Sequence, residues 1–164
     1  MFKFLLMSNL NEDAIKLILD ERIPAFNKFR LHNLTFKPNL SHQDFSGKNL
    51  SLAFLNGAIC TQTDFSKCIL KKTNFVQAEL NNCNFANSDL TDTLFMYAEM
   101  KNCNLRNCNM KKSNFMWANL YNADLSGSKI TRTIFVEANL QSAIIKDFNK
   151  ENAFLKYAKL DSSE

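Results

Sequence analysis

The stretch AELNNCNFANSDL, residues 78–90, carries a large apolar residue at every fifth position. Leu80, Phe85 and Leu90 are these residues, and each follows Ala, Cys or Ser by two positions. A straight strand cannot bury all three, because its side chains alternate between two faces. An α-helix cannot either, because five steps of about 100° turn the face by about 140°. The chain must turn once per repeat, always in the same sense, so that each large residue points at a common axis.

The five-residue pattern extends through most of the chain. From Leu40 to Leu160, every position at this spacing is apolar except Lys150. Two positions earlier, each repeat carries Ala, Ser, Thr or Cys, with few exceptions. The exceptions are Pro38, Gln43, Lys48 and Phe148. We therefore expect end effects at the first repeats and one local distortion beside Lys150.

A second, longer period indicates how many repeats make one coil. Phenylalanines recur at every fourth repeat in two series, which are Phe75, Phe95, Phe115 and Phe135, and Phe45, Phe65 and Phe85. Four repeats per coil would stack each series directly, with coils roughly 4.8 Å apart. The sequence therefore predicts an all-β solenoid with four sides, a stacked phenylalanine core, about six coils and a length of roughly 29 Å.

Two segments carry a resemblance to a known family. AELNNCNFANSDL and ANLYNADLSGS, residues 118–128, resemble the A-(D/N)-L-x-x motif of the pentapeptide-repeat family. The resemblance covers about three quarters of the chain and implies a right-handed quadrilateral β-helix. Residues 18–50 also resemble the leader of many bacterial members, in which a short helix and an aromatic-Asn-x-aromatic-Arg stretch precede the first coils. Here that stretch is Phe26, Asn27, Phe29 and Arg30.

The two ends of the solenoid are predicted to differ. Residues 11–20 read as a short helix capped by Asn11, and Pro24 suits the first turn of a second short helix. Because a solenoid end exposes core and unpaired backbone, we expect residues 1–37 to form a helical cap. The repeats occupy residues 38–160, and residues 161–164 are a polar tail with no dedicated lid.

The composition limits the chemistry. The chain has 20 Lys and Arg against 16 Asp and Glu, and the repeats carry a weak positive balance that gives no strongly acidic, DNA-like surface. The five cysteines are predicted to be free thiols that act as small apolar residues, and His32 and His42 have no cysteine nearby. No phosphate-binding loop and no nucleophile–base pairing is present. We therefore predict no metal, no cofactor and no enzyme activity.

The N-terminal segment does not read as a cleaved secretory signal, and export by a route that needs no such signal stays open. The apolar stretch from Phe2 to Met7 is short, and no small-residue cleavage site follows it. No apolar run approaches the roughly 18 residues that a membrane helix requires. We expect a cytoplasmic protein with no membrane contact.

Folding the sequence at four repeats per coil predicts two surface features. The first is an exposed apolar stripe, a candidate protein interface. It comprises Phe54, Val76, Leu94, Met96, Tyr97, Met116, Trp117, Ile134 and Val136. The second is a basic side, which Asp89 and Asp92 interrupt. It comprises Lys71, Lys72, Lys111, Lys112, Lys129 and Arg132. We interpret the basic side mainly as a solvated ladder of alternating charges, so nucleic-acid binding is not favoured.

These observations favour a non-enzymatic protein-interaction module, whose partner the sequence does not name. A homodimer is the simplest arrangement that would bury the apolar stripe, and the edge of the C-terminal coil is the alternative dimer site. The resemblance also implies an alternative, a quinolone-resistance-like DNA mimic that binds DNA gyrase or topoisomerase IV. The net positive repeats, the uninterrupted register from Leu40 to Ile145 and the lack of a C-terminal dimerisation helix depart from those proteins. A bacterial effector delivered to a host cell is a further alternative.

Overall fold

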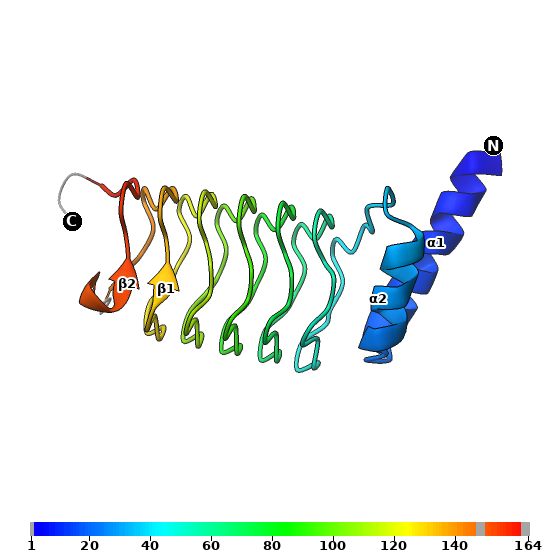
Figure 1. Cartoon of the computed structure of the whole chain (residues 1–164), viewed down its shortest axis with the longest axis horizontal. Coiled ribbons are helices and arrows are strands. Elements are labelled where there is room, and N and C mark those ends of the chain that lie inside the picture. Colours follow the sequence, from blue (N-terminus) through cyan, green and yellow to red (C-terminus); the bar gives the residue numbers. More distant parts are fainter. Residues whose placement is uncertain (1, 147–149, 162–164) are drawn as a thin grey trace.

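The computed structural model describes residues 2–146 and 150–161 and shows a rod of stacked coils with two helices at one end (Figure 1). Helix α1 spans Phe2–Leu19 and helix α2 spans Ile23–His32. The coils follow, and near the C-terminal end lie β1 at Thr133–Ile134, a short 3-10 helix η1 at Lys150–Asn152 and β2 at Ala153–Phe154. The helices therefore lie before the first coil, where the sequence predicts a cap.

Each coil contains four of the five-residue repeats and pairs with its neighbours in parallel. Asn74 pairs with Leu94, and Leu94 pairs with Asn114, in one of four columns of backbone bridges. The N–H of Phe95 donates to the carbonyl of Asn114 at 2.7 Å, and this contact recurs from coil to coil. Only β1 and β2, two residues each, form strands within the described residues, because every side turns a corner before a strand can lengthen.

The corners are built from side-chain-bearing residues in the left-handed backbone region. At one corner the Ala98 N–H donates to the Phe95 carbonyl at 3.0 Å, and Tyr97 between them has a φ of 59°. Such a conformation costs a residue other than glycine about 1–2 kcal/mol. The inter-coil ladder compensates, because the Tyr97 N–H also donates to the carbonyl of Met116 in the next coil at 3.1 Å. Regular turning therefore needs few glycines, in agreement with the composition.

The core is a double column of phenylalanine rings along the axis. All seven predicted stack residues are buried, namely Phe45, Phe65, Phe75, Phe85, Phe95, Phe115 and Phe135. Phe95 lies parallel to Phe75 at 5.2 Å and to Phe115 at 4.7 Å, measured between ring centroids. Its ring also meets Phe85 of the other column edge-on at 5.8 Å. The four-repeat period therefore places like rings directly above one another, as predicted.

The small inward residues satisfy backbone carbonyls as well as leaving room at the corner. Thr93 Oγ1 donates to the carbonyl of Leu70 at 2.7 Å, and Ser88 Oγ donates to that of Phe65 at 2.7 Å. Each bond joins a residue to the core position of the preceding coil. A small side chain fits this position, and one that also carries a hydrogen-bond donor can satisfy the carbonyl. This explains why Ser, Thr and Cys occur there as well as Ala.

The prediction that a helix starts at Asn11 is wrong. Helix α1 begins at Phe2 and passes through Asn11. The side chain of Asn11 instead joins the first coil, where its Nδ2 donates to the Asn39 carbonyl at 2.7 Å and its Oδ1 accepts from the Asn39 N–H at 2.6 Å. Because the exposed edge of the solenoid competes for the same polar groups, Asn11 pairs with the coil rather than with its own helix.

Two further residues of the cap region complete the edge of the first coil. Glu21 Oε2 accepts from the Asn49 N–H at 3.0 Å, and Asn27 Oδ1 accepts from the Phe54 N–H at 2.8 Å. In inner coils the equivalent N–H groups donate to the carbonyls of the coil before. Side chains of the helical segment thus replace the backbone of a missing coil, which prevents an open edge.

Arg30 anchors helix α2 against the rod. Its buried guanidinium donates to the carbonyls of Phe54 at 3.1 Å and Asn56 at 2.8 Å, and also to that of Phe36. Burial lowers the pKa of the Arg30 guanidinium, because desolvation disfavours its charged form. Pro24 lies in the first turn of α2, as predicted.

The repeat is distorted near Lys150. Phe148, one of the two residues for which the sequence predicts a distortion, lies outside the described residues. From Lys150 the chain forms η1, and at Ala153–Phe154 it rejoins the stack by pairing with Thr133–Ile134. A lysine at a core position therefore coincides with a helical turn instead of a regular side.

Candidate interaction surface

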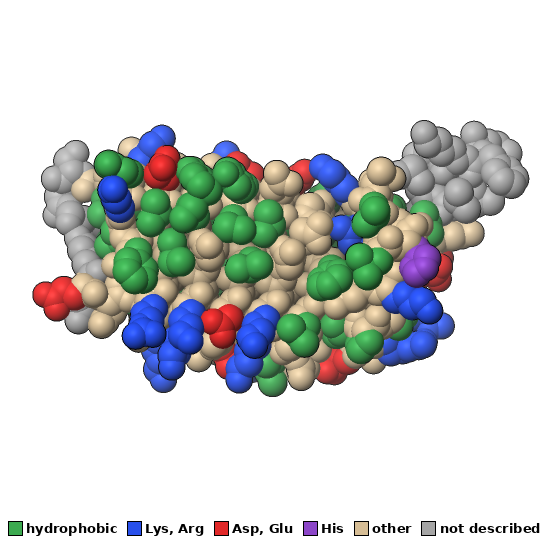
Figure 2. All heavy atoms as spheres, viewed as in Figure 1, with side chains coloured by type: hydrophobic (Ala, Val, Ile, Leu, Met, Phe, Trp, Pro, Cys, Tyr) green, Lys and Arg blue, Asp and Glu red, His purple; other side chains and the backbone are tan. Residues whose placement is uncertain are grey.

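One of the four sides of the rod is predominantly apolar along its length. Its central column, read from the cap, is Phe54, Asn74, Leu94, Asn114, Ile134 and Phe154. A second column lies beside it, and comprises Val76, Met96, Met116 and Val136. We call these two columns the apolar side, and Figure 2 shows it as a green band along the rod.

All residues of the predicted apolar stripe are at least partly exposed. Phe54 is exposed, while Leu94, Ile134, Val76, Met96, Met116 and Val136 are half-buried. Phe154 was not in the predicted set, yet it continues the central column and is 56% exposed. It follows Ile134 by four repeats, and this spacing is the signal that could have identified it.

Asparagines interrupt the central column at alternate coils. Asn74 Oδ1 accepts a hydrogen bond from the Val76 N–H, and Asn114 Oδ1 accepts one from the Met116 N–H, each at 3.0 Å. These local bonds hold the two amides against their own turns. From Phe54 to Ile134 the column therefore presents bulky apolar residues about two coil spacings apart, or roughly 10 Å, and Phe154 follows Ile134 in the next coil.

Tyr97 and Trp117 form a stacked pair along one edge of the apolar side. Their ring centroids are 4.8 Å apart with an interplanar angle of 9°, and the two side chains are 50% and 41% exposed. Both have left-handed backbone, with φ of 59° and 57°. Asparagine tolerates this conformation better and occupies it at other corners, as at Asn102 and Asn122. Two bulky aromatic residues at strained, exposed corners suit contact with another molecule.

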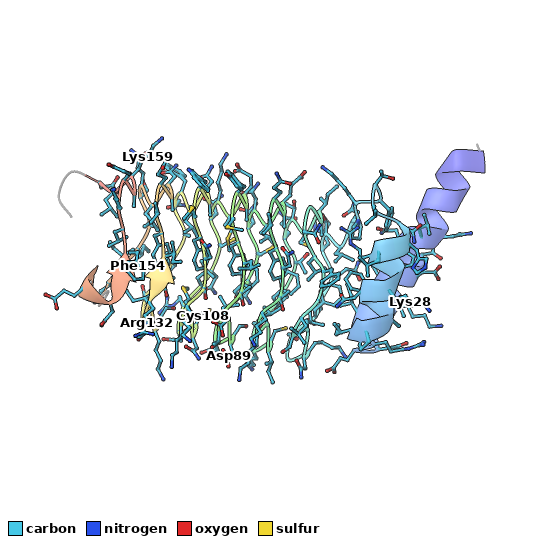
Figure 3. All side chains as sticks on the ribbon, in the orientation of Figure 1. Lys28, Asp89, Cys108, Arg132, Phe154 and Lys159 are labelled. Atoms are coloured by element: carbon cyan, nitrogen blue, oxygen red, sulfur yellow. The ribbon has the colours of Figure 1, made fainter. Side chains whose placement is uncertain are left out.

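A row of charged residues borders the opposite edge of the apolar side. It comprises Lys72, Asp92, Lys112 and Arg132, which we call the basic edge. All four are at least partly exposed, and within the described ranges none has an ion-pair partner. Figure 2 shows this row below the apolar band, and Figure 3 places Arg132 below Phe154.

The other predicted basic residues face away from the apolar side. Lys71 forms an ion pair with Asp89 at 3.1 Å, whereas Lys111 and Lys129 are exposed. Desolvation by burial acts to raise the pKa of Asp89, but hydrogen bonds from Thr91 and Lys71 outweigh it and hold this pKa below its ordinary value. The column Lys72, Asp92, Lys112 and Arg132, for which the sequence predicts a self-compensating ladder, has no ion pair within the described ranges, and neither has Lys111 or Lys129.

The five cysteines are buried, free thiols at the core. Cys83 Sγ donates to the Cys60 carbonyl at 2.8 Å, and Cys103 Sγ donates to the Leu80 carbonyl at 2.9 Å. Burial raises the pKa of Cys68, Cys83 and Cys108 to about 12, and it also raises the pKa of Cys60 and Cys103. A thiol kept in its protonated form is a poor nucleophile and a poor metal ligand.

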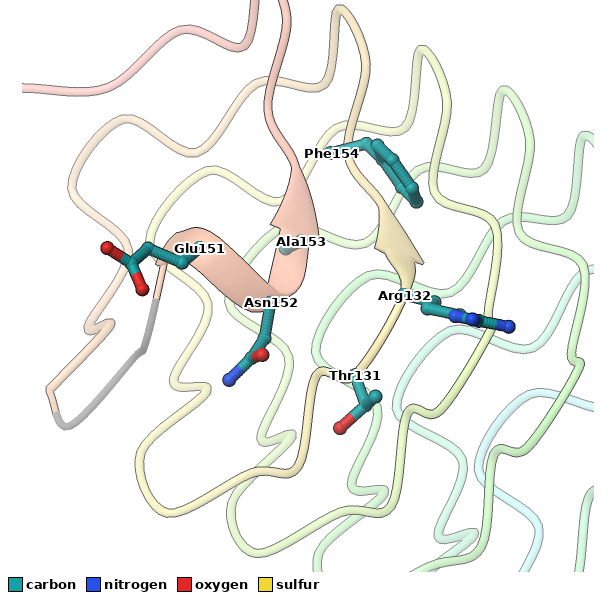
Figure 4. A pocket seen from close by; sticks show the side chains of 6 residues that line it. All are labelled: Thr131, Arg132, Glu151, Asn152, Ala153 and Phe154. Atoms are coloured by element: carbon teal, nitrogen blue, oxygen red, sulfur yellow. The ribbon is translucent and has the colours of Figure 1, made fainter.

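A hollow beside η1 lies at the C-terminal end of the apolar side. It is lined by Thr131, Arg132, Glu151, Asn152, Ala153 and Phe154 (Figure 4). The side chain of Glu151 points away from Arg132 in this view, so the two charges do not converge on one point. The hollow therefore adds a polar rim to the end of the apolar side.

Two further features are absent from the described residues, 2–146 and 150–161. They contain no group of three or more His, Cys, Asp or Glu side chains placed to hold a metal ion. No helix in the same part of the chain is long and apolar enough to cross a membrane.

The geometry defines a class of protein, a four-sided parallel β-solenoid with one apolar side. The family models agree with this class, because the model described as pentapeptide repeat region matches residues 58–133 and the model described as pentapeptide repeats (8 copies) matches residues 39–71. The chain belongs to the pentapeptide-repeat family. Membership agrees with the right-handed β-helix that the sequence predicts. A comparison with curated protein sequences gave no match.

Several solved structures are similar to this chain. A pentapeptide repeat protein of the Arabidopsis thaliana thylakoid lumen is 29% identical, with a TM-score of 0.49, over 57% of this chain and 68% of that one. HetL from the cyanobacterium Nostoc, involved in heterocyst differentiation regulation, is 17% identical, with a TM-score of 0.32, over 75% and 85%. QnrB1, a plasmid-mediated fluoroquinolone resistance protein, is 18% identical, with a TM-score of 0.44, over 77% and 78%.

Proposed function

We propose that this protein is a non-enzymatic interaction module, a rod of about six coils that binds a protein partner through its apolar side. The observation that carries the proposal is the stacked Tyr97–Trp117 pair, which is half exposed and held in left-handed backbone beside Met96 and Met116. Tyr, Trp and Met are enriched where proteins meet, and an apolar band of this length is rarely left in contact with water.

The rod itself supports this role. Its coils are tied by a continuous backbone ladder and by a filled ring core, so the apolar side has little freedom to rearrange. A preorganised surface loses little conformational entropy on binding. The surface is also flat, which suits an extended protein partner better than a small molecule.

The proposal can be tested with a variant that keeps the fold. Asparagine already occupies alternate positions of the central column and several left-handed corners, so Leu94→Asn, Tyr97→Asn and Trp117→Asn together should preserve the coils. Tyr121→Asn is the matched control, because Tyr121 is an exposed aromatic residue at a different corner.

Tagged wild type, the triple variant and Tyr121→Asn are compared in capture experiments, followed by reconstitution with the purified partner. We expect the wild type and the control to retain the partner and the triple variant to lose it. Retention by all three proteins would refute the apolar side as the docking surface. A gyrase supercoiling assay tests the alternative partner, and inhibition that survives the triple substitution would favour a topoisomerase bound elsewhere on the rod.

A further inference from the structure

The two long edges of the apolar side differ in chemistry over four successive coils of the rod. The basic edge carries Lys72, Asp92, Lys112 and Arg132, and the opposite edge carries Gln77, Tyr97, Trp117 and Glu137. We call the second row the aromatic edge. Successive members of each row are four repeats apart, so the two rows run side by side along the rod, and Figure 2 shows the basic edge below the apolar band.

Residues level with each other on the two edges are chemically matched. Asp92 lies level with Tyr97, Lys112 with Trp117, and Arg132 with Glu137. A carboxylate accepts a hydrogen bond from a phenol, and an arginine pairs with a glutamate. A lysine can bind the one face of the Trp117 indole that Tyr97 does not cover.

These matched groups do not meet within one molecule. Each pair is separated by the width of the apolar side, and among the residues that the structure describes no hydrogen bond or ion pair joins their side chains. Both edges of one rod are therefore left with chemistry that a second surface could satisfy.

We propose that the occupant of the apolar side is a second copy of this chain, bound face to face with the two rods parallel. The inference rests on the proposed function. The two-fold axis runs along the rod, between the two columns of the apolar side. Rotation about it places the basic edge of one copy against the aromatic edge of the other, and each coil stays level with the same coil of the second copy. Arg132 then meets Glu137 of the second copy, and Lys112 meets Trp117 of the second copy. The symmetry makes each contact occur twice.

The same rotation brings apolar residues together at the centre of the interface. Leu94 faces Met96 of the second copy, and Ile134 faces Val136 of the second copy. The polar pairs lie at the rim on both sides of this centre. An apolar centre with a polar rim is the usual anatomy of a protein interface.

The charge pattern selects the parallel arrangement over the antiparallel one. An axis across the rod would place the basic edge of one copy against the basic edge of the other. With the two rows in full overlap, Lys72 would face Arg132 of the second copy, and Glu137 would lose its cationic partner; only Asp92 would face an opposite charge, on Lys112. A different protein would satisfy the apolar side only if it carried acidic groups along one margin and none along the other. This chain already carries one such group, because Glu137 of the aromatic edge lies level with Arg132 of the basic edge.

Charge exchange tests both the second copy and its orientation. Sedimentation equilibrium is measured for wild type, Arg132→Glu, Glu137→Arg and the double variant, with far-UV circular dichroism to confirm folding. Both residues are exposed, so all variants should fold. We expect the wild type to dimerise, each single change to raise the dimer dissociation constant about tenfold because the pair occurs twice, and the double variant to recover most of the loss. Tighter association of Arg132→Glu would indicate antiparallel rods and would overturn the proposal, as would independent effects of the two changes.

A distance measurement tests the orientation by another route. A spin label on Asp13→Cys, at an exposed position of α1, reports where the two caps lie. The native thiols are buried and do not compete for the label. Parallel rods place both labels at the same end, whereas antiparallel rods separate them by at least a further rod length of roughly 29 Å. Labels at opposite ends would overturn the proposal.

The outcomes separate this inference from the proposed function. A protein that stays monomeric up to about 100 μM, where a dimer of micromolar affinity would be populated, refutes the second copy. If that monomer still binds another protein through Leu94, Tyr97 and Trp117, the proposed function stands without the dimer. A dimer that survives asparagine at all three positions refutes the apolar side for both.

Discussion

Phe95 lies at the centre of the ring stack, and its truncation to alanine measures how rigid the coils are. The ring makes parallel contacts with Phe75 and Phe115 and an edge contact with Phe85. Phe→Ala in a protein core costs about 3–5 kcal/mol, and each aromatic pair contributes roughly 0.5–1.5 kcal/mol of that loss. The Phe95 N–H is bonded to the Asn114 carbonyl at 2.7 Å, so the ladder keeps the coils from closing over the cavity. We therefore expect a loss of about 4–5 kcal/mol.

Urea unfolding followed by far-UV circular dichroism gives the free energies for comparison. Phe135→Ala should cost about 2–3 kcal/mol, because coils near the end of a solenoid fray before the rest unfolds. Tyr121→Ala is the control at an exposed corner and should cost under about 0.5 kcal/mol. Losses below about 1 kcal/mol at both phenylalanines would refute the argument that rigid coils hold the stack open.

Three further predictions concern the cap, the thiols and the corners. Asn27→Ala removes the acceptor of the Phe54 N–H and the donor to the Leu52 carbonyl, so it should lower the free energy of unfolding by about 1–2 kcal/mol and speed hydrogen exchange at the Phe54 amide. Exchange at Phe54 no faster than in the control variant Lys28→Ala would contradict this. Because burial raises the pKa of the thiols, the stability that the cysteines contribute is fully present below pH 9 and is lost as the pH rises towards about 12. Chemical unfolding across this pH range measures the loss, and a free energy of unfolding that does not change with pH would be inconsistent with buried thiols. Native protein at pH 8 should also resist a thiol reagent that modifies the unfolded chain. Gly127→Ala should lower the free energy of unfolding more than Gly57→Ala, because a Cβ at residue 127 would clash with Asn107 Oδ1 while the space around residue 57 is open. Equal midpoints of thermal unfolding for the two variants would show that Asn107 moves aside freely.

Much of the apolar side could be predicted from the sequence, because the fold is periodic. Once four repeats make one coil, the neighbours of Leu94 in the stack are Asn74 and Asn114 by arithmetic alone. The same arithmetic places Phe154 in the column, although the irregular repeat around Lys150 obscured it. The part that the period could not supply is the partner, because an exposed surface constrains only the chemistry of what binds it.

The cap could be predicted only in outline. Its position and the two helices follow from the apolar pattern and Pro24, but α1 extends to Phe2 rather than starting at Asn11. Helix boundaries depend on where polar side chains find partners. The partner of Asn11 is Asn39, which is distant in the sequence and adjacent only in the folded chain.

The sequence by itself determined the five-residue repeat, the stacked phenylalanine core and the four-sided coil, because these follow from local spacing repeated many times. The tertiary structure alone decided how Asn11, Glu21, Asn27 and Arg30 close the first coil. It also decided that the Tyr97 and Trp117 rings stack at a strained corner. These features depend on side-chain orientation and on contacts between distant segments, and a periodic spacing carries information about neither.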